Sequence, residues 1–356
     1  MVRSALIGCG RIGAILEDDP LRNKPCTHFG GMRSAGIIVT SACDIRLDRL
    51  RSFSQRASIA DARCFTDYHE LLSHPTNIVT IASHTDTHAE ITIAAARSGC
   101  KVIVCEKPVA ANIHDARKML DACRAHNVTL IINHERRYDP RYRAAKKLID
   151  RGAIGKIISI RGILPTHGFQ GTSYESSGGG PLLHDGTHLV DIISYFAGRI
   201  VHVDGRFKRN SRTTGYEDHA WALLETETGI PAHIAVGGGM HYFGFGVEVF
   251  GSEGKIEIGN GYNRLYRAKK SRFYKGFFDL SEVRFPSVKG NCFTELYREA
   301  KKIVHDDKLL PSSSGEDGLA ALETVHAVYL SAHKRREVTI PSGKDINIKK
   351  IFALTD

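Results

Sequence analysis

The stretch Ser4-Ala5-Leu6-Ile7-Gly8-Cys9-Gly10-Arg11-Ile12-Gly13 decides the fold class of this chain. Its apolar residues predict a buried strand, and the pattern Gly-x-Gly-x-x-Gly follows that strand directly. The first glycine permits a tight turn, the second lets the backbone approach a phosphate, and the third allows close packing of a helix on the strand. The amide groups at the helix N-terminus attract negative charge. A plain strand-to-helix turn without a ligand is the alternative interpretation.

Further short apolar runs alternate with amphipathic stretches up to about residue 132. The apolar runs are residues 37–40, 78–81, 102–104 and 128–132, and helical spacing occupies residues 87–98 and 113–126. Helices that alternate with buried strands indicate a doubly wound parallel sheet. We therefore expect a dinucleotide-binding Rossmann domain over residues 1–132, with these residues against the cofactor: Gly8, Gly10, Arg11, Ile12 and Gly13.

The pattern changes to longer alternating strands after residue 152. Period-two alternation occupies residues 156–163, 201–208, 219–227, 231–237 and 246–250. It predicts a large open sheet, mostly antiparallel, with one face covered. We expect a second α/β domain over residues 133–356. The Gly- and Ser-rich segment 166–180 is a candidate active-site loop before a helical run over 181–196, and an amphipathic helix over 315–333 is expected under the second sheet.

An acidic residue after the second strand distinguishes between the two nicotinamide cofactors. Asp44 stands where a carboxylate binds the ribose hydroxyls, which favours NAD over NADP, although it also suits a helix cap. Arg46 and Arg49 follow, and they leave a 2′-phosphate, and so NADP, as the alternative. Gly13 and Asp44 are 31 residues apart where about 20 is usual, so we expect an insertion. Its polar, proline-broken body, residues 17–28, is expected near the pyrophosphate and substrate, or equally at a surface or subunit contact.

Residues able to carry chemistry follow the later strands of the first domain. Lys107 comes after the fifth strand, at the sheet edge where open α/β folds bind ligands, and Glu106 precedes it. His184 and His188 are four residues apart, so they share one face of the expected helix, and histidine pairs can perform acid–base work. Other candidates for the cofactor or substrate are Ser83, His84, His88, Asn133, Arg137 and Tyr174.

The order and separation of these motifs resemble the glucose-fructose oxidoreductase, inositol dehydrogenase and rhizopine-catabolism (Gfo/Idh/MocA) family over nearly the whole chain. The matching segments are the glycine turn, Glu106-Lys107-Pro108, and residues 136–140, 178–188, 249–254 and 314–318. The resemblance implies a Rossmann domain followed by an α/β domain whose open sheet joins subunits, here a homodimer or homotetramer. It also implies NAD(P)-dependent oxidation or reduction of one carbinol of a sugar, cyclitol or nucleotide-sugar.

By this resemblance, Lys107 hydrogen-bonds the reacting oxygen and His188 exchanges its proton while hydride passes to or from the nicotinamide. Both types suit the task, because histidine titrates near neutrality and a desolvated lysine loses some basicity. The chain departs from the family where many relatives carry an aspartate, since His184 stands there and Asp185 comes next. Either Asp185 takes that role or His184 contacts substrate, which we favour. Asp185 and Asp191 are each three residues from His188 and could orient it. The predicted substrate contacts are Lys107, Arg137, Tyr174, His184 and His188.

Composition narrows the remaining classes of function. The 49 Lys and Arg against 39 Asp and Glu give a net charge of +10, but the basic residues are scattered, which disfavours nucleic acid and weakly favours an anionic small substrate. No apolar run could span a bilayer, no signal peptide is recognisable, and eight cysteines lack any Cys-x-x-Cys pair. We expect a cytoplasmic enzyme with reduced thiols and no metal. The alternatives are an NAD-dependent glycosidase that uses transient oxidation, and a non-catalytic sensing regulator.

Overall fold

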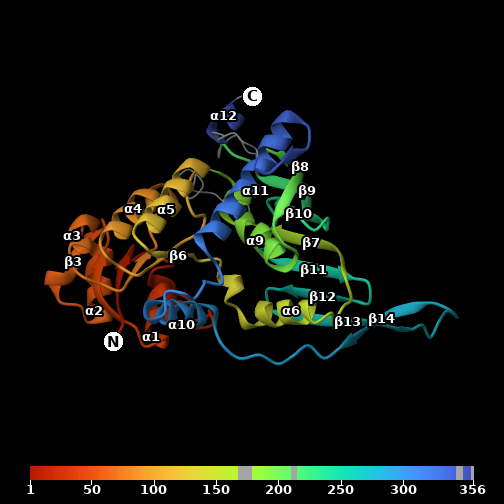
Figure 1. Ribbon diagram of the computed structural model, residues 1–356, viewed down its shortest axis with the longest axis horizontal. Helices are drawn as coiled ribbons and strands as arrows, with labels where there is room; N and C mark the ends of the chain where they lie inside the picture. The colour runs from red at the N-terminus through yellow and green to blue at the C-terminus, as the bar shows by residue number, and fades with distance from the viewer. Residues whose placement is uncertain (167–178, 210–214, 342–347, 354–356) are drawn as a thin grey trace. The chain divides into compact units, whose positions relative to one another are not determined.

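The computed structural model describes residues 1–166, 179–209, 215–341 and 348–353 (Figure 1). The chain divides into two compact units. The first comprises Met1–Asp139 with Gly290–Leu319, and the second comprises Pro140–Lys289 with Ala320–Asp356. The sequence alone carried no signal that a segment near residue 300 returns to the first unit.

The first unit contains a six-stranded parallel sheet in the order β3-β2-β1-β4-β5-β6. This order reverses direction beside β1, as in a dinucleotide-binding doubly wound sheet, and it confirms the predicted Rossmann fold class. The strands are β1 (Arg3–Ile7), β2 (Ile38–Cys43), β3 (Cys64–Phe65), β4 (Ile78–Ile81), β5 (Val102–Cys105) and β6 (Thr129–Ile132).

The register of this sheet aligns the residues that follow its central strands. Ile7 pairs with Ile81, Ile81 pairs with Cys105, and Cys105 pairs with Ile132. The chain therefore leaves β1, β4, β5 and β6 at one edge and at one level. The residues directly after those strand ends are Gly8, Ala82, Glu106 and Asn133.

Helices of the first unit pack their apolar stripes on the sheet. They are α1 (His28–Ser34), α2 (Leu47–Ala57), α3 (Tyr68–Leu72), α4 (His88–Arg97), α5 (Ile113–Ala125) and α10 (Cys292–His305). The returning helix α10 begins at an Asn291 side chain that accepts the amides of Phe293 and Thr294. It lies against α1 so closely that a Cβ at Gly31 would come within 2.8 Å of the Phe293 carbonyl oxygen.

The predicted insertion interrupts the first helix without changing its register. The amides of His28 and Phe29 donate to the carbonyls of Ile12 and Gly13, each at 3.0 Å. An uninterrupted α-helix makes that bond between residues four apart, so twelve residues are extra. When these twelve are discounted, the 31-residue separation from Gly13 to Asp44 becomes 19, close to the usual value of about 20. The extra segment contains a three-ten helix, η1 (Ile15–Asp18), and a loop.

The second unit contains a nine-stranded sheet in the order β14-β13-β12-β11-β7-β10-β9-β8-β15. Neighbours are antiparallel except β7 and β10, as predicted for a mostly antiparallel sheet. The strands are β7 (Ile157–Pro165), β8 (Ile200–Lys208), β9 (His219–Thr226), β10 (Pro231–Gly237), β11 (Gly246–Gly251), β12 (Gly254–Gly259), β13 (Tyr262–Lys270), β14 (Phe278–Val283) and β15 (Val338–Thr339).

Helices cover one face of this sheet. They are α6 (Pro140–Asp150), α8 (Pro181–His184), α9 (Gly186–Ala197), α11 (Gly315–Lys334) and α12 (Ile348–Ala353). A Cβ at Gly162 would lie 2.8 Å from the Leu189 side chain of α9, and one at Gly205 would lie 2.6 Å from the Val328 carbonyl of α11. The expected packing of the long amphipathic helix on the second sheet is thereby confirmed. No helix among the described residues has the length and apolar character needed to cross a membrane.

Candidate active site

The three glycines of the first turn differ in what surrounds them. Gly8 has a φ of +96°, and a Cβ there would lie 2.5 Å from the Ala82 carbonyl oxygen. At Gly13 a Cβ would lie 2.1 Å from the Gly8 carbonyl oxygen, so the chain's own packing requires both glycines. Gly10 is different, because the nearest atom to a Cβ there is Nη1 of Arg49, at 3.5 Å. The protein leaves that space open, as a turn that admits a pyrophosphate must.

Asp44 lies beside this turn rather than apart from it. One carboxylate oxygen accepts the amide of Cys9 at 2.8 Å and the other accepts the amide of Arg46 at 2.9 Å. Arg46 itself is exposed and binds Asp48 through Nε and Nη2, at 3.1 and 2.7 Å. Two arginines were considered for a 2′-phosphate. Arg49 lies next to Gly10, whereas Arg46 is paired with Asp48. Arg11 is exposed and Ile12 is half-buried on the same turn.

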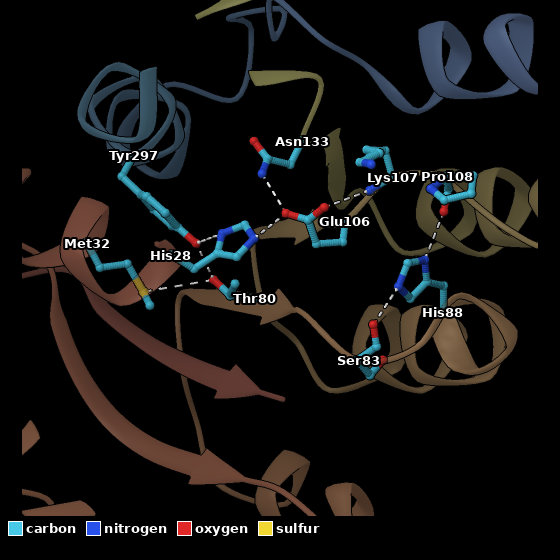
Figure 2. Close-up of polar contacts among 10 residues, drawn as sticks. All are labelled: His28, Met32, Thr80, Ser83, His88, Glu106, Lys107, Pro108, Asn133 and Tyr297. Carbon is cyan, nitrogen blue, oxygen red and sulfur yellow. Dashed lines mark hydrogen bonds and ion pairs between the residues drawn. The ribbon is translucent and has the colours of Figure 1, made fainter. Parts of the chain in front are cut away.

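The loop after β4 contains the next predicted group of residues. His88 is buried at the start of α4, with Nδ1 3.0 Å from the Pro108 carbonyl and Nε2 3.3 Å from the Ser83 carbonyl. Burial lowers the pKa of His88, although the carbonyl contacts oppose that effect. The Thr87 hydroxyl lies 2.8 Å from the Ser83 hydroxyl and 2.8 Å from the His84 carbonyl. His88 thus connects this loop to the segment that carries Lys107 (Figure 2).

Glu106 is the centre of a buried polar network at the carboxyl end of β5 (Figure 2). Its Oε1 lies 2.8 Å from Nε2 of His28 and accepts the side-chain amide of Asn133 at 2.6 Å. Its Oε2 accepts the backbone amide of Lys107 at 3.2 Å. Burial favours the neutral acid, but the hydrogen bonds and the charges of His28 and Lys107 prevail and lower the pKa of Glu106 to about 2. The carboxylate is therefore ionised next to Lys107, whose side chain is half-buried.

Tyr297, His28 and Thr80 belong to this network but were missed as site residues by the sequence analysis. Tyr297 comes from α10, and its hydroxyl lies 2.8 Å from Nδ1 of His28 and 2.9 Å from the Thr80 hydroxyl. His28 appeared only as the last residue of the expected insertion. Neither Tyr297 nor His28 carries a local pattern, because the contacts join positions as much as 269 residues apart. The anomalous glycine-to-aspartate spacing was the one signal that pointed toward His28.

Arg137 lies after β6 and is buried. Its Nη1 donates to the Ser312 carbonyl at 3.1 Å and contacts Oδ1 of Asp317 at 3.0 Å. Those partners belong to the segment that returns to the first unit. The guanidinium therefore ties that segment to the end of β6, and its role toward a substrate stays a prediction.

His184 and His188, both in the second unit, belong to separate helices rather than to the one expected over 181–196. The helix is divided at Asp185, where the His188 amide bonds to the Asp185 carbonyl three residues earlier. Gly186 follows the break, and a Cβ there would lie 2.9 Å from the Leu182 side chain. His188 is 6% exposed, whereas the His184 side chain is 34% exposed and its Nδ1 lies 3.1 Å from Oδ1 of Asp185. Tyr174 and most of the predicted loop, residues 167–178, lie outside the described residues.

Glu217 is a buried carboxyl group that the sequence analysis did not identify. It accepts the amides of Gly180 and Leu182 at 3.2 and 2.9 Å and the Tyr329 hydroxyl at 2.9 Å. Burial raises the pKa of Glu217 to about 7, against the effect of those three hydrogen bonds. It supports the start of α8, the short helix that ends at His184 and precedes the helix that carries His188.

Comparison with known proteins agrees with this architecture. Residues 2–134 match the model of the oxidoreductase family with an NAD-binding Rossmann fold, and residues 142–257 match the GFO/IDH/MocA C-terminal domain. The chain is 27% identical to myo-inositol 2-dehydrogenase of Thermotoga maritima over 95% of its own length and 98% of the relative. It is 27% identical to D-apiose dehydrogenase of Paraburkholderia graminis, covering 96% and 90% of the two chains.

A solved structure is similar over nearly the whole chain. The crystal structure of a probable dehydrogenase from Thermotoga maritima is 25% identical, with a TM-score of 0.77 over 96% of this chain and 99% of that one. The matches cover both units in the order in which the sequence motifs occur. They confirm the resemblance, the nicotinamide cofactor and the class of enzyme. The chain belongs to the GFO/IDH/MocA family of NAD-binding oxidoreductases.

Proposed function

We propose that the enzyme transfers hydride between NAD(H) and a secondary alcohol or ketone of a sugar, cyclitol or nucleotide-sugar. The observation that carries this proposal is the position of Lys107 beside the ionised Glu106, at the same sheet edge as the glycine turn. β5 is the second strand from β1, so about 10 Å separates their ends at the usual strand spacing. A dinucleotide bound at the turn reaches across that distance.

Each predicted residue then has a defined task. The glycine turn accommodates the pyrophosphate, and Asp44 binds the ribose hydroxyls, which favours NAD over NADP. NAD(H), when bound, supplies the hydride acceptor or donor. The Lys107 ammonium group donates a hydrogen bond to the reacting oxygen of the substrate. His188 accepts the hydroxyl proton during oxidation and returns it during reduction. His184 and Arg137 bind hydroxyl groups of the substrate.

The substrate class rests on the relatives and on charge. The named relatives act on inositol and on apiose, which are polyhydroxylated compounds with secondary alcohols. The net charge of +10 also supports a test of phosphorylated and nucleotide-linked sugars.

Assembly through the nine-stranded sheet is part of the proposal. The sheet face opposite α9 and α11 exposes apolar side chains of β7 and β9, and the β13–β14 hairpin exposes a cluster of aromatic side chains. These residues are Ile158, Ile163, Leu223, Phe273, Tyr274, Phe277 and Phe278. Exposed apolar area of this extent supports burial against a second copy in a homodimer or homotetramer.

The test follows absorbance at 340 nm with NAD and NADP over a panel of sugars, cyclitols, sugar phosphates and nucleotide-sugars. Lys107→Ala and His188→Ala should each lower kcat by roughly 10²- to 10⁴-fold, the usual contribution of a positioned acid or base. Fluorescence titration with NADH should show that both variants retain the cofactor. Lys101→Ala, an exposed lysine before the other end of β5, and His114→Ala, an exposed histidine of α5, are matched controls.

Three outcomes would contradict the proposal. The first is that no compound of the panel changes the absorbance. The second is hydrolysis of aryl glycosides without net NADH, which would identify an NAD-dependent glycosidase. The third is full turnover by Lys107→Ala, which would remove the lysine from the mechanism.

A further inference from the structure

We propose that His28 is a positioning residue that acts on Lys107 through Glu106. The insertion that precedes His28 keeps the helix register and so holds His28 against the Glu106 carboxylate. This inference rests on the proposed function, because it concerns how Lys107 is prepared for the reaction. Three observations carry it: the hydrogen bond from His28 to Glu106, the anchoring of the inserted segment, and the contact between Glu106 and Lys107.

The His28 ring is held between two hydrogen-bond partners. His28 has Tyr297 on one ring nitrogen and Glu106 on the other, and each contact measures 2.8 Å (Figure 2). An ionised carboxylate only accepts, so Nε2 of His28 must carry its proton and donate to Glu106. On the other side of the ring, the Tyr297 hydroxyl contacts Nδ1 and lies 2.9 Å from the Thr80 hydroxyl. The ring is therefore held on both sides, with its Nε2 proton directed at Glu106.

The inserted segment is anchored so that His28 keeps its place in the helix. Glu17 of η1 accepts the Cys26 amide at 3.0 Å and the Thr27 hydroxyl at 2.8 Å. Thr27 is the N-cap of α1, and its hydroxyl oxygen accepts the Gly30 amide at 3.0 Å. A Cβ at Gly30 would lie 2.5 Å from the Glu17 carboxylate, so this contact needs the glycine. The two ends of the inserted segment are therefore joined by hydrogen bonds immediately before His28.

Glu106 transmits the effect of His28 to Lys107 in two ways. Its Oε2 accepts the Lys107 backbone amide, so the position of the carboxylate orients the residue. Its negative charge also lies next to Lys107, and the attraction between the two contributes to the lowered pKa of Glu106. Without His28, the buried carboxylate loses a hydrogen bond and an ion-pairing partner. Glu106 would then take up a proton more readily, and Lys107 would lose its negative neighbour.

The experiment measures kcat and KM across pH for His28→Phe, Glu106→Gln and the double variant. His28→Phe should lower kcat by about 10- to 100-fold, as loss of a residue that orients a reacting group does. The alkaline limb of the kcat/KM profile should move toward lower pH in both single variants. The double variant should have the same kcat as Glu106→Gln, because His28 acts only through that carboxylate. NADH affinity should change less than about twofold.

Two further variants separate a positioning role from a structural one. His28→Gln restores an amide donor toward Glu106 and should recover part of kcat, and it also serves if His28→Phe does not fold. Thr80→Val breaks the far end of the same network and should lower Tm without moving the alkaline limb. A lowered Tm with an unmoved limb in both His28→Phe and His28→Gln would overturn the inference.

The failure of this inference differs from failure of the proposed function. An inactive Lys107→Ala enzyme together with wild-type kcat and wild-type pH dependence in His28→Phe would overturn the role of His28 alone. A fully active Lys107→Ala enzyme would overturn both. Multiplicative losses in the double variant would show that His28 acts by a route that does not pass through Glu106.

Discussion

Glu106 of the first unit and Glu217 of the second are both buried carboxyl groups that accept three hydrogen bonds, yet their charges differ. Glu106 is 7% exposed and Glu217 is 1% exposed. The pKa of Glu106 falls to about 2, whereas that of Glu217 rises to about 7. Burial raises both values, so the partners must decide the outcome.

The partners differ in charge rather than in number. Glu106 faces His28, Asn133 and the Lys107 segment, and two of these carry or can carry a positive charge. Glu217 faces two backbone amides and the Tyr329 hydroxyl, which are neutral donors. Neutral hydrogen bonds offset only part of the desolvation of a carboxylate, whereas nearby cations reverse it. The first unit therefore holds an ionised carboxylate, Glu106, beside Lys107. The second unit holds a carboxyl group, Glu217, that titrates near neutral pH.

The largest expected effect is on stability when each carboxyl is replaced by leucine. Glu106→Leu leaves the Nε2 proton of His28, the Asn133 amide and the Lys107 amide without their acceptor. Breaking a buried charged pair costs about 3–5 kcal/mol. Glu217→Leu removes a neutral acceptor for much of the group's population and should cost about 1–3 kcal/mol. Urea unfolding at pH 7 measures both values, and equal losses would show that charge does not distinguish the two sites.

Much of the fold could be predicted because its signals are local. The glycine turn beside β1 and the buried runs that became β4, β5 and β6 have the pattern of a parallel sheet. The strands from β7 to β11 alternate as antiparallel strands do. The predictions missed β3, which has two residues, and β12 to β15, which have mixed or exposed patterns. They also missed α10, whose place beside α1 depends on contacts with residues far away in sequence.

The candidate site also contains residues that local sequence signals predict and residues that depend on contacts between distant segments. Asp44 was predicted from its place after β2, and the structure brings it to the Cys9 amide beside the glycine turn. Glu217 and Tyr297 carry no sequence pattern, and they became visible only when the chain brought distant segments together. The break between α8 and α9 was also not predictable from spacing, because apolar periodicity continues through Asp185.

The second effect is a pH dependence of opposite sign for the two carboxyls. The folded pKa of Glu217 lies above its ordinary value of 4.5, so the folded state retains a proton that the unfolded state releases. Its contribution to stability is complete below pH 4.5 and is lost as the pH rises through about 7. Glu106 behaves in reverse, contributing above pH 4.5 and losing that contribution as the pH falls toward about 2.

The variant Glu217→Gln isolates the pH-dependent contribution of Glu217 to stability. The free energy of unfolding of the wild type minus that of the variant should fall by roughly 2–3 kcal/mol between pH 4.5 and 8, since one pKa unit corresponds to about 1.4 kcal/mol. Subtracting the variant removes the contribution of the histidines, which titrate in the same range in both proteins. Parallel stability curves for the two proteins would contradict the raised pKa of Glu217.

The smallest effect concerns the two tyrosines that complete the networks. Tyr329→Phe and Tyr297→Phe each remove one hydroxyl, at a cost of about 1 kcal/mol. Their consequences for pH should nevertheless differ. Tyr329 donates directly to Glu217, so its loss removes a bond to the charged form and should move the decline in stability to a higher pH range. Tyr297 contacts Nδ1 of His28, and its loss leaves the Nε2 contact with Glu106 intact. Tyr297→Phe should therefore not change the pH at which stability is lost on acidification. Thermal unfolding from pH 3 to 8 distinguishes these results. A shift of the low-pH loss of stability in Tyr297→Phe would mean that the charge of Glu106 depends on the contact between Tyr297 and His28 as well as on its own hydrogen bonds.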